Sequence, residues 1–395
     1  MKAEELQNNV FFTAKDGDIS GTSQRDPLGL QPIWSFYGRQ VINHLTTIST
    51  SIHGFREVLL CLSICSEIRE SKPNASYSDL ILLFEQLFIY SAISRGEIEG
   101  IIGADNGKNR FDTSKGNPEI STSQTILVRE ISLGYYGRYK TPLSTMGVIN
   151  GKSELIIGLD EVKKLYGECY FDILEAFKTF IEISKRFNNF VAPKKLFEAV
   201  FGKFRPNERE FWMNRLYKVG EEEKELMKLC YKKADHDLSE KELFSSLPQE
   251  RSEVSNILKL EPYLRCLEEV FYKAMRSKDL KSIEIEKMKE HKRRYDDFCR
   301  IPGSNVSSLF KKRINFLREK CSPYLDNYIE NVVKYHELVC DQKNSSVWVE
   351  LDASGMLQSF VDVGDVNVNI DDWGRDYYLS SLRSVKKEIL RFSNV

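Results

Sequence analysis

Two acidic residues in the last fifty positions have the type and spacing that metal-dependent chemistry needs. Glu350 and Asp352 lie two positions apart in an alternating apolar and polar run, so a strand there would place both side chains on one face. A metal-dependent nuclease needs such acids together with a further acid, and commonly a nearby lysine. The residues after Glu350 do not form the E-x-K arrangement. A divergent nuclease therefore stays an alternative, beside the simpler interpretation of a solvated hairpin face.

His53 is the histidine with the most interesting surroundings, because it lies in an aromatic region directly before Gly54, Phe55 and Arg56. A histidine that acts as a general base needs a nucleophile and an orienting acid. No residue close to His53 in the sequence supplies them. A structural histidine is therefore the favoured interpretation, and a catalytic base is the alternative.

Motifs for phosphate and metal binding are incomplete. The segment 147–153 is one residue short of a phosphate-binding loop, whose backbone N–H groups must wrap the phosphate. The segment 365–376 has the acidic spacing of a calcium loop, but Ile370 replaces the turn glycine and Asp376 replaces the bidentate glutamate. The eight cysteines are spread thinly and form no CxxC pair. We expect no metal and no cofactor, and we favour a non-enzymatic protein while leaving a divergent site open.

The strongest positive signal is a basic segment at residues 287–320. It contains eleven Lys and Arg residues against four acidic residues, and aromatic residues are interleaved with them. Such residues on neighbouring helices can follow a phosphate backbone. The candidate nucleic-acid-binding residues are Lys292, Arg293, Arg294, Lys311, Lys312 and Arg313. The segment 341–377 is acidic, so the two segments could instead pair with each other, which would weaken the prediction of nucleic-acid binding.

A further candidate surface follows an irregular segment, residues 1–32, that Gly and Pro interrupt repeatedly. The apolar and aromatic run that comes next is expected to dock on the protein's own core or on a partner. The candidate partner-binding residues are Trp34, Phe36, Tyr37 and Arg39.

Composition limits the class of protein. Of the 395 residues, 41% are hydrophobic and 29% are charged, which suits a folded chain with a sizeable core. With a formal net charge of −1, attraction to nucleic acid or to a membrane surface would have to come from a local patch. The longest apolar stretch, 80–90, is shorter than the roughly 20 residues that span a bilayer, and the first residues lack the apolar core of a signal peptide. We expect a cytoplasmic protein with free thiols and no membrane partner.

Apolar periodicity predicts a mainly α-helical fold, a stack of helices with an irregular aromatic N-terminal segment. The helices are expected over 55–71, 77–94, 160–188, 372–392 and, as an antiparallel stack, within 221–344. Turn residues at 353–355 between two alternating runs predict a small β-hairpin near the C-terminus.

The length of the chain favours more than one domain. We predict an apolar helical domain over 1–150, in which the glycine-rich span 100–123 is a long exposed loop. A helical stack with the basic patch follows over 151–345, and the hairpin with the last helix occupies 346–395.

The segment Asp26-Pro-Leu-Gly-Leu-Gln-Pro-Ile-Trp-Ser-Phe-Tyr-Gly-Arg-Gln-Val, with Leu45-Thr-Thr-Ile-Ser-Thr and His53-Gly-Phe-Arg after it, resembles the opening of uncharacterised bacterial proteins encoded in anti-phage defence operons. The resemblance covers about the first 60 residues and includes no motif of known chemistry. It implies one subunit of a multi-protein defence assembly, and it assigns no site residue.

Three hypotheses about function follow. The first is a non-enzymatic helical subunit of a bacterial assembly, in antiviral defence, that binds other protein subunits and, as a further partner, DNA. The second is a divergent metal-dependent nuclease. The third is a small-molecule sensor, in which the 100–123 span covers a pocket between apolar helices.

Overall fold

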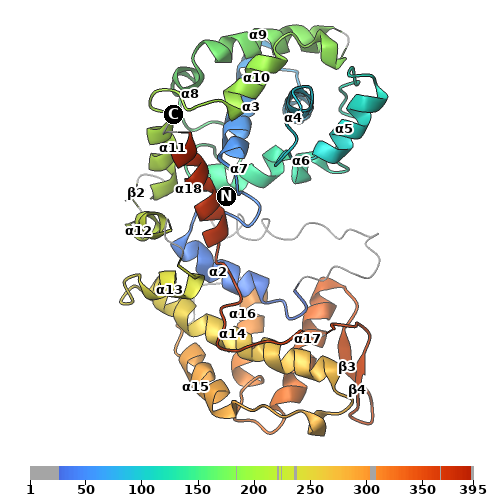
Figure 1. The fold of residues 1–395 in the computed structure, drawn as a ribbon, viewed down its shortest axis with the longest axis vertical. Coiled ribbons are helices and arrows are strands. Elements are labelled where there is room, and N and C mark those ends of the chain that lie inside the picture. The colour runs from blue at the N-terminus through green and yellow to red at the C-terminus, as the bar shows by residue number, and fades with distance from the viewer. Residues whose placement is uncertain are drawn as a thin grey trace. The chain divides into compact units, whose positions relative to one another are not determined.

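The chain forms two compact units, and each unit is built from segments that are far apart in the sequence (Figure 1). The computed structural model describes residues 26–183, 185–219, 222–223, 225–234, 238–302, 308–364 and 366–392. Unit 1 contains the described part of residues 1–42 together with residues 233–379. Unit 2 contains residues 43–232 and 380–395. The predicted mainly α-helical fold is confirmed, whereas the three consecutive segments predicted from the sequence do not coincide with these units.

Unit 2 contains most of the described helices. They are α3 (Ile52–Ser71), α4 (Tyr77–Ile93), α5 (Ala104–Thr113), α6 (Glu130–Leu133), α7 (Tyr135–Thr145), α8 (Leu159–Tyr166), α9 (Glu168–Glu182), α10 (Pro193–Phe201), α11 (Glu208–Tyr217), α12 (Glu225–Lys233) and α18 (Leu379–Arg391), with one 3-10 turn, η1 (Phe187–Asn189). Two short strands, β1 (Lys218–Val219) and β2 (Glu222–Glu223), pair in antiparallel orientation.

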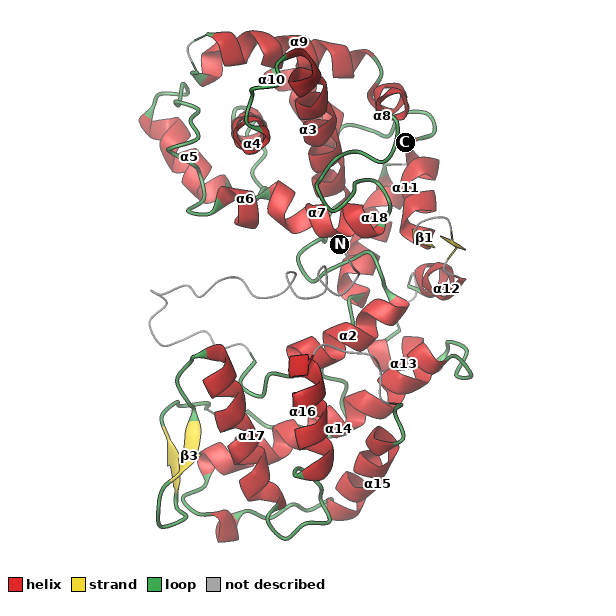
Figure 2. Cartoon of the chain, turned by 180° about the vertical axis from the view of Figure 1, so that it is seen from behind, coloured by secondary structure: helices red, strands yellow, loops and turns green. Residues whose placement is uncertain are grey.

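Helix α4 is the centre of unit 2. Its residues from Leu80 to Ile93 are buried, as the sequence predicts for a helix that is apolar on nearly all sides. Helices α3, α5, α6 and α10 lie around it in both views (Figures 1 and 2). Because burial of one Leu or Phe side chain contributes about 1.5–3 kcal/mol, α4 is the main apolar support of this unit. Ser51 and Ser76 cap the N-termini of α3 and α4 with their side-chain oxygens.

The span 100–123 is not the single exposed loop that the sequence suggested, because it contains helix α5. Gly103 precedes α5 with a φ of 79°, a left-handed conformation that glycine adopts without strain. Gly107 faces α4, where a Cβ atom would lie 2.9 Å from Cδ1 of Ile93 and 3.0 Å from Cγ2 of Ile89. The glycines that suggested a loop therefore start the helix and let it approach α4 closely.

The predicted helix over 160–188 is divided into α8 and α9. Gly167 lies between them with a φ of 57°. A right-handed helix cannot include a positive φ, so α8 ends at this glycine. The second helix ends at Glu182, before the predicted end.

Three buried carboxyl groups meet in unit 2, on α3, α4 and the start of α6. Glu57 is fully buried, and neither of its side-chain oxygens has a hydrogen-bond partner among the described residues. One oxygen of Glu85 accepts a hydrogen bond from the backbone N–H of Tyr136, and Oε2 of Glu130 accepts one from Ile126 at 2.8 Å. Burial raises the pKa of Glu85 to about 8 and that of Glu130 to about 7, and burial with the nearby carboxyl groups raises the pKa of Glu57 well above its usual range.

Unit 1 is organised around one long helix, α14 (Ser252–Arg276), which carries Pro262 in its interior. The other helices of this unit are α2 (Gln31–Val41), α13 (Glu240–Ser245), α15 (Met288–Cys299), α16 (Ser308–Glu319) and α17 (Tyr328–Lys343), with one 3-10 turn, η2 (Leu280–Ser282). Residues of α14 such as Leu260, Leu264 and Leu267 are fully buried, and α2, α13, α15 and α17 all contact this helix. The core of unit 1 is therefore the apolar surface of α14.

The predicted hairpin near the C-terminus is confirmed. Strands β3 (Val349–Leu351) and β4 (Leu357–Ser359) are antiparallel, and Leu351 lies opposite Leu357. The last helix, α18, begins at Leu379 rather than near residue 372. Tyr377 and Tyr378 have φ angles of 47° and 70°, which a right-handed helix cannot include.

Within the described ranges, no helix is both long and apolar enough to cross a membrane.

The buried carboxyl groups predict that the protein becomes less stable as pH rises. Their pKa values in the folded state lie above the value near 4.5 of an exposed glutamate, so the folded state holds more protons than the unfolded state between about pH 4.5 and 8. The free energy of unfolding should therefore fall as pH rises through this window. The Glu85→Gln variant keeps an oxygen for the Tyr136 N–H and cannot ionise, so it should gain roughly 1–3 kcal/mol over the wild type between pH 5 and pH 8.5.

Urea unfolding followed by circular dichroism at both pH values measures this difference. Asp105→Asn, at an exposed position on α5, is the matched control and should follow the wild type. If the free energy of unfolding changed with pH in the same way for the wild type and Glu85→Gln, Glu85 would not be the source of the pH dependence.

Candidate functional site

A cavity of about 680 Å³ lies in unit 2, beside the first turn of α3. Its walls come from α3, α7, α10, α18 and the chain segment before α5, so parts of the sequence that are far apart meet there. Cavities of roughly 300–1,000 Å³ are the usual size of small-molecule sites. This cavity is therefore the candidate functional site.

A buried ion pair fixes the elements around the cavity. The Nε atom of Arg56 on α3 lies 2.7 Å from Oε1 of Glu208 on α11, and both side chains are buried. The Nη1 atom of Arg56 donates to the carbonyl oxygens of Val200 at 2.5 Å and Gly202 at 2.7 Å. Because the last carbonyl groups of a helix have no partner within it, Arg56 satisfies the end of α10 and ties it to α3 and α11.

His53 shares the carbonyl group of Val200 with Arg56. Its Nδ1 atom is 2.9 Å from that oxygen, and a carbonyl oxygen can only accept, so Nδ1 carries the proton and the Nε2 atom of the neutral ring is an acceptor. The pKa of His53 is lowered to about 4, chiefly by burial; the bond to Val200 opposes this shift, and the charges of Arg56 and Arg391 add to it. The ring is neutral at physiological pH, and its Nε2 atom has no hydrogen-bond partner in the described ranges.

Aromatic rings form one wall of the cavity. The ring of Phe201 lies 4.2 Å from that of His53 and 5.0 Å from that of Phe197, centroid to centroid, with interplanar angles of 30° and 15°. Phe392, after α18, meets the His53 ring edge-on at 5.0 Å. Phe88 of α4 is nearly parallel to Phe201 at 5.9 Å. The wall therefore rests on the central helix of unit 2.

Polar groups also line the cavity, next to these rings. One oxygen of Glu388 on α18 accepts hydrogen bonds from Oγ of Ser51 at 3.0 Å and from the N–H of Ile52 at 2.6 Å, where the N-terminus of α3 favours a negative charge. Burial nevertheless raises the pKa of Glu388. The Tyr139 hydroxyl accepts from the N–H of Ser51 at 3.2 Å.

These groups suit binding better than proton transfer. A general base works best when its pKa is close to the working pH, whereas that of His53 is about 4. The hydroxyl group of Ser51 is already engaged, because it donates to Glu388 and accepts from the backbone N–H of His53. The cavity therefore offers fixed acceptors and flat aromatic surfaces.

The sequence singled out His53 but not its neighbours in the cavity. Glu388 and Phe392 are more than 300 positions away, and the partner of the ring is a backbone carbonyl group, which no residue type indicates. A weak signal was the position of His53 three residues before Arg56, which places both side chains on one face of a helix.

The four candidate partner-binding residues have contacts within unit 1. The ring of Trp34 lies 5.5 Å from that of Tyr378, and Phe36 lies 5.0 Å from Phe310. Tyr37 is buried, and Nε of Arg39 donates to the hydroxyl group of Tyr378 at 3.3 Å. Of the two expectations for this run, docking on the protein's own core is the one that the structure supports.

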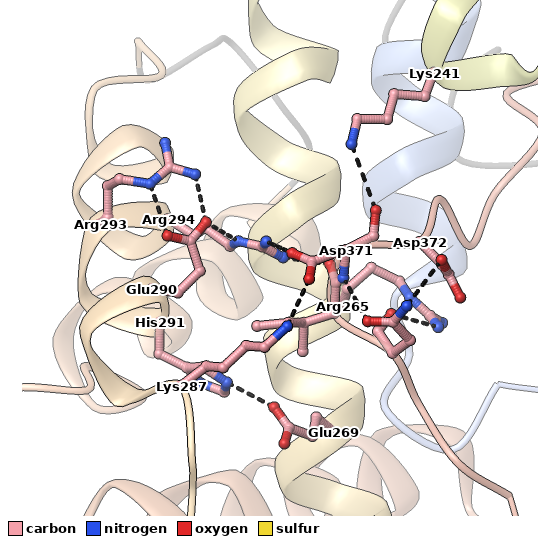
Figure 3. Close-up of polar contacts among 12 residues, drawn as sticks. Lys241, Arg265, Glu269, Lys287, Glu290, His291, Arg293, Arg294, Asp371 and Asp372 are labelled. Carbon is pink, nitrogen blue, oxygen red and sulfur yellow. Dashed lines mark hydrogen bonds and ion pairs between the residues drawn. The ribbon is translucent and has the colours of Figure 1, made fainter.

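The basic and acidic segments are joined by ion pairs in unit 1 (Figure 3). Asp371 lies between Lys287 and Arg294, with a distance of 2.6 Å to each cation. Arg294 is only 6% exposed, pairs with Glu290 at 2.8 Å, and also donates to the carbonyl group of Ile370. The pairing considered from the sequence is therefore present at these residues, and Arg294 serves the fold.

The other candidate nucleic-acid-binding residues are divided between surface and core. Arg313 is buried and donates to the carbonyl group of Gly29 at 3.0 Å and to Gln342 at 2.9 Å. Arg293 is 62% exposed and pairs with Glu290 and Asp297. The ammonium group of Lys292 lies over the ring of Tyr324 at 5.1 Å, and Lys311 and Lys312 are exposed. The six residues do not form one continuous basic surface.

Glu350 and Asp352 have separate surroundings. Glu350 is in strand β3, opposite Gln358. Asp352 belongs to the turn, where its Oδ1 atom accepts from the N–H groups of Ser354 at 2.8 Å and Met356 at 2.9 Å. The hydroxyl group of Ser354 donates to the same atom, and this bond, followed by those from the backbone, lowers the pKa of Asp352. In the part of the chain that the structure describes, no group of three or more His, Cys, Asp or Glu residues is placed to hold a metal ion.

The ion-pair network predicts that neighbouring arginines differ in their effect on stability. Arg294→Met leaves Asp371 and the Ile370 carbonyl group without their buried donor, and should lower the free energy of unfolding by about 2–4 kcal/mol. Arg293→Met removes an exposed arginine that pairs with the same Glu290, and should cost about 0–1 kcal/mol. Thermal unfolding of both variants measures the difference, and equal losses would show that Arg294 is not structural.

Comparisons of the chain with protein-family models, with curated proteins and with solved structures found no match, so the argument for function rests on the geometry of the site.

Proposed function

We propose that unit 2 is a binding module for a small organic molecule, which occupies the cavity beside α3. The observation that carries this proposal is the meeting of an aromatic wall with the fixed acceptors of His53 and Glu388 in one cavity of about 680 Å³. The lining is mixed, because Arg138, Glu388 and Arg391 stand beside the aromatic rings, and small-molecule sites combine apolar surface with well-placed polar groups. Among the three hypotheses from the sequence, the small-molecule sensor therefore has the best support.

The cavity is held in one shape by close packing, which favours ligand binding because little ordering is required. Gly54 on α3 lies against the ring of Tyr139 on α7 so closely that a Cβ atom at this position would overlap the ring. The Phe55 and Tyr139 rings also meet edge-on at 4.8 Å. From the span 100–123, Gly100 and Ile102, which precede α5, are part of the lining.

The assembly hypothesis also remains a proposal. It comprises a cytoplasmic location, a role in antiviral defence, protein partners and binding of DNA. Its support is the resemblance of the first 60 or so residues and the exposed cations Lys311 and Lys312. The alternative of a nuclease at Glu350 and Asp352 has no additional support, because the turn engages Asp352.

The binding proposal predicts that a variant whose larger side chain fills the cavity can no longer bind the ligand. Ser384 on α18 lines the cavity and is half-buried, so Ser384→Trp should occupy the space with an indole ring, while Ser384→Ala leaves it open. Both proteins are to be screened for thermal stabilisation against a metabolite collection. At least one compound should raise the melting temperature of the wild type and of Ser384→Ala by several degrees, because ligand at 100 times Kd adds about 2.7 kcal/mol to stability.

The Ser384→Trp variant should not respond to that compound. Native mass spectrometry of the protein purified from its host provides the second measurement. A bound compound should co-purify with the wild type and be missing from Ser384→Trp. An equal response of all three proteins would show that the compounds bind elsewhere, and the complete absence of a bound or stabilising compound would refute the proposal.

A further inference from the structure

We propose that the cavity of unit 2 takes a flat, uncharged heteroaromatic molecule with an amino group, and that the Nε2 atom of His53 accepts a hydrogen bond from that group. This inference rests on the proposed function and deepens it, since it names the chemical class of the ligand.

The orientation of His53 is fixed by the protein itself. Its Nδ1–H donates to the carbonyl group of Val200, which Arg56 holds from the other side. The choice of tautomer thus depends on a backbone oxygen, and Nε2 is left with a lone pair and no partner in the described ranges. Since the pKa of His53 is about 4, the ring stays an acceptor at neutral pH and does not become a second donor. A group that binds there must donate.

The aromatic wall indicates a flat ligand. The ring of Phe201 lies within 5.0 Å of those of His53 and Phe197, and Phe392 makes a T-shaped contact with His53. Aromatic pairs prefer offset stacking or edge-to-face contact at separations of about 4.5–7 Å, and a planar ligand can make either contact with these rings. An aliphatic ligand would bury apolar surface but would make no stacking contact with these rings.

The cavity is lined by charges of both signs. Arg138 donates its Nε–H to the carbonyl oxygen of Leu133 at 2.8 Å, and Arg391 lies where its charge acts on both His53 and Glu388. Glu97 and Glu99 are exposed at the same cavity. The two arginines and the two exposed acids offset one another, so a ligand without net charge suits the cavity, and the acceptors His53 and Glu388 call for a donor such as an amino group.

The test uses two probes that differ in one group. Quinazoline is a flat bicyclic heteroaromatic molecule without a donor, and 4-aminoquinazoline is the same ring system with an amino group. Isothermal titration of the whole chain with each probe should give a five- to tenfold lower Kd for 4-aminoquinazoline, the range expected for one hydrogen bond. In His53→Phe, which keeps an aromatic ring beside Phe201, the two Kd values should become equal within about twofold.

Nitrogen NMR of the wild type gives a measurement that does not depend on the variant folding. The Nε2 signal of His53 should move toward that of a hydrogen-bonded acceptor with 4-aminoquinazoline and stay in place with quinazoline. Equal binding of both probes at the cavity, or an unchanged Nε2 signal, would overturn this inference and leave the proposed function standing. Failure of both probes, while another compound stabilises the wild type but not Ser384→Trp, would overturn it in the same way. If no compound of any kind binds, the proposed function fails as well.

Discussion

The buried pair of Arg56 and Glu208 is the interaction on which the candidate site depends. Each charge has lost its water, and desolvation lowers the pKa of Arg56. Such a pair contributes little net stability by itself, but removal of one partner leaves the other uncompensated, at a cost of about 3–5 kcal/mol. Arg56 offsets its desolvation by binding two carbonyl groups at the end of α10 as well as the carboxylate. The position of the Val200 carbonyl group, and with it the tautomer of His53, follows from that arrangement.

The parts of the fold that could be predicted depend on local patterns. The apolar periodicity of α3 and α4 and the turn between β3 and β4 are features of short segments, and both predictions are confirmed. The cavity could not be predicted, because it joins His53 to Phe201 and Glu388 through contacts that cross about 150 and 335 positions. The span 100–123 was misjudged for a different reason. Glycine signals both a loop and a close helix contact, and only the proximity of Ile89 and Ile93 to Gly107 distinguishes them.

Charge in the sequence was also an incomplete guide to the surface. The segment 287–320 has an excess of cations, yet Arg294 and Arg313 are buried and satisfy carbonyl groups of Ile370 and Gly29. Arginine is suited to this task, because its planar group supplies several donors in fixed directions. Segments without regular structure, such as the one before α18, leave carbonyl groups that need such donors. A local excess of arginine can therefore reflect irregular backbone nearby, as it does here, as readily as a nucleic-acid surface.

Burial pushes several ionisable groups of unit 2 toward their neutral forms, His53 and Glu388 of the cavity among them, and this has a consequence for selectivity. His53 loses its proton, whereas Glu57, Glu85 and Glu388 retain theirs to higher pH than an exposed glutamate. Tyr135, which lines the cavity, is affected in the same direction, because burial and the charges of Glu57 and Glu85 raise its pKa. The transfer of a charged group into such surroundings costs several kcal/mol unless a counter-charge is present. A neutral ligand avoids that cost, and its hydrogen-bond donors can then be selected by fixed acceptors such as His53 and Glu388.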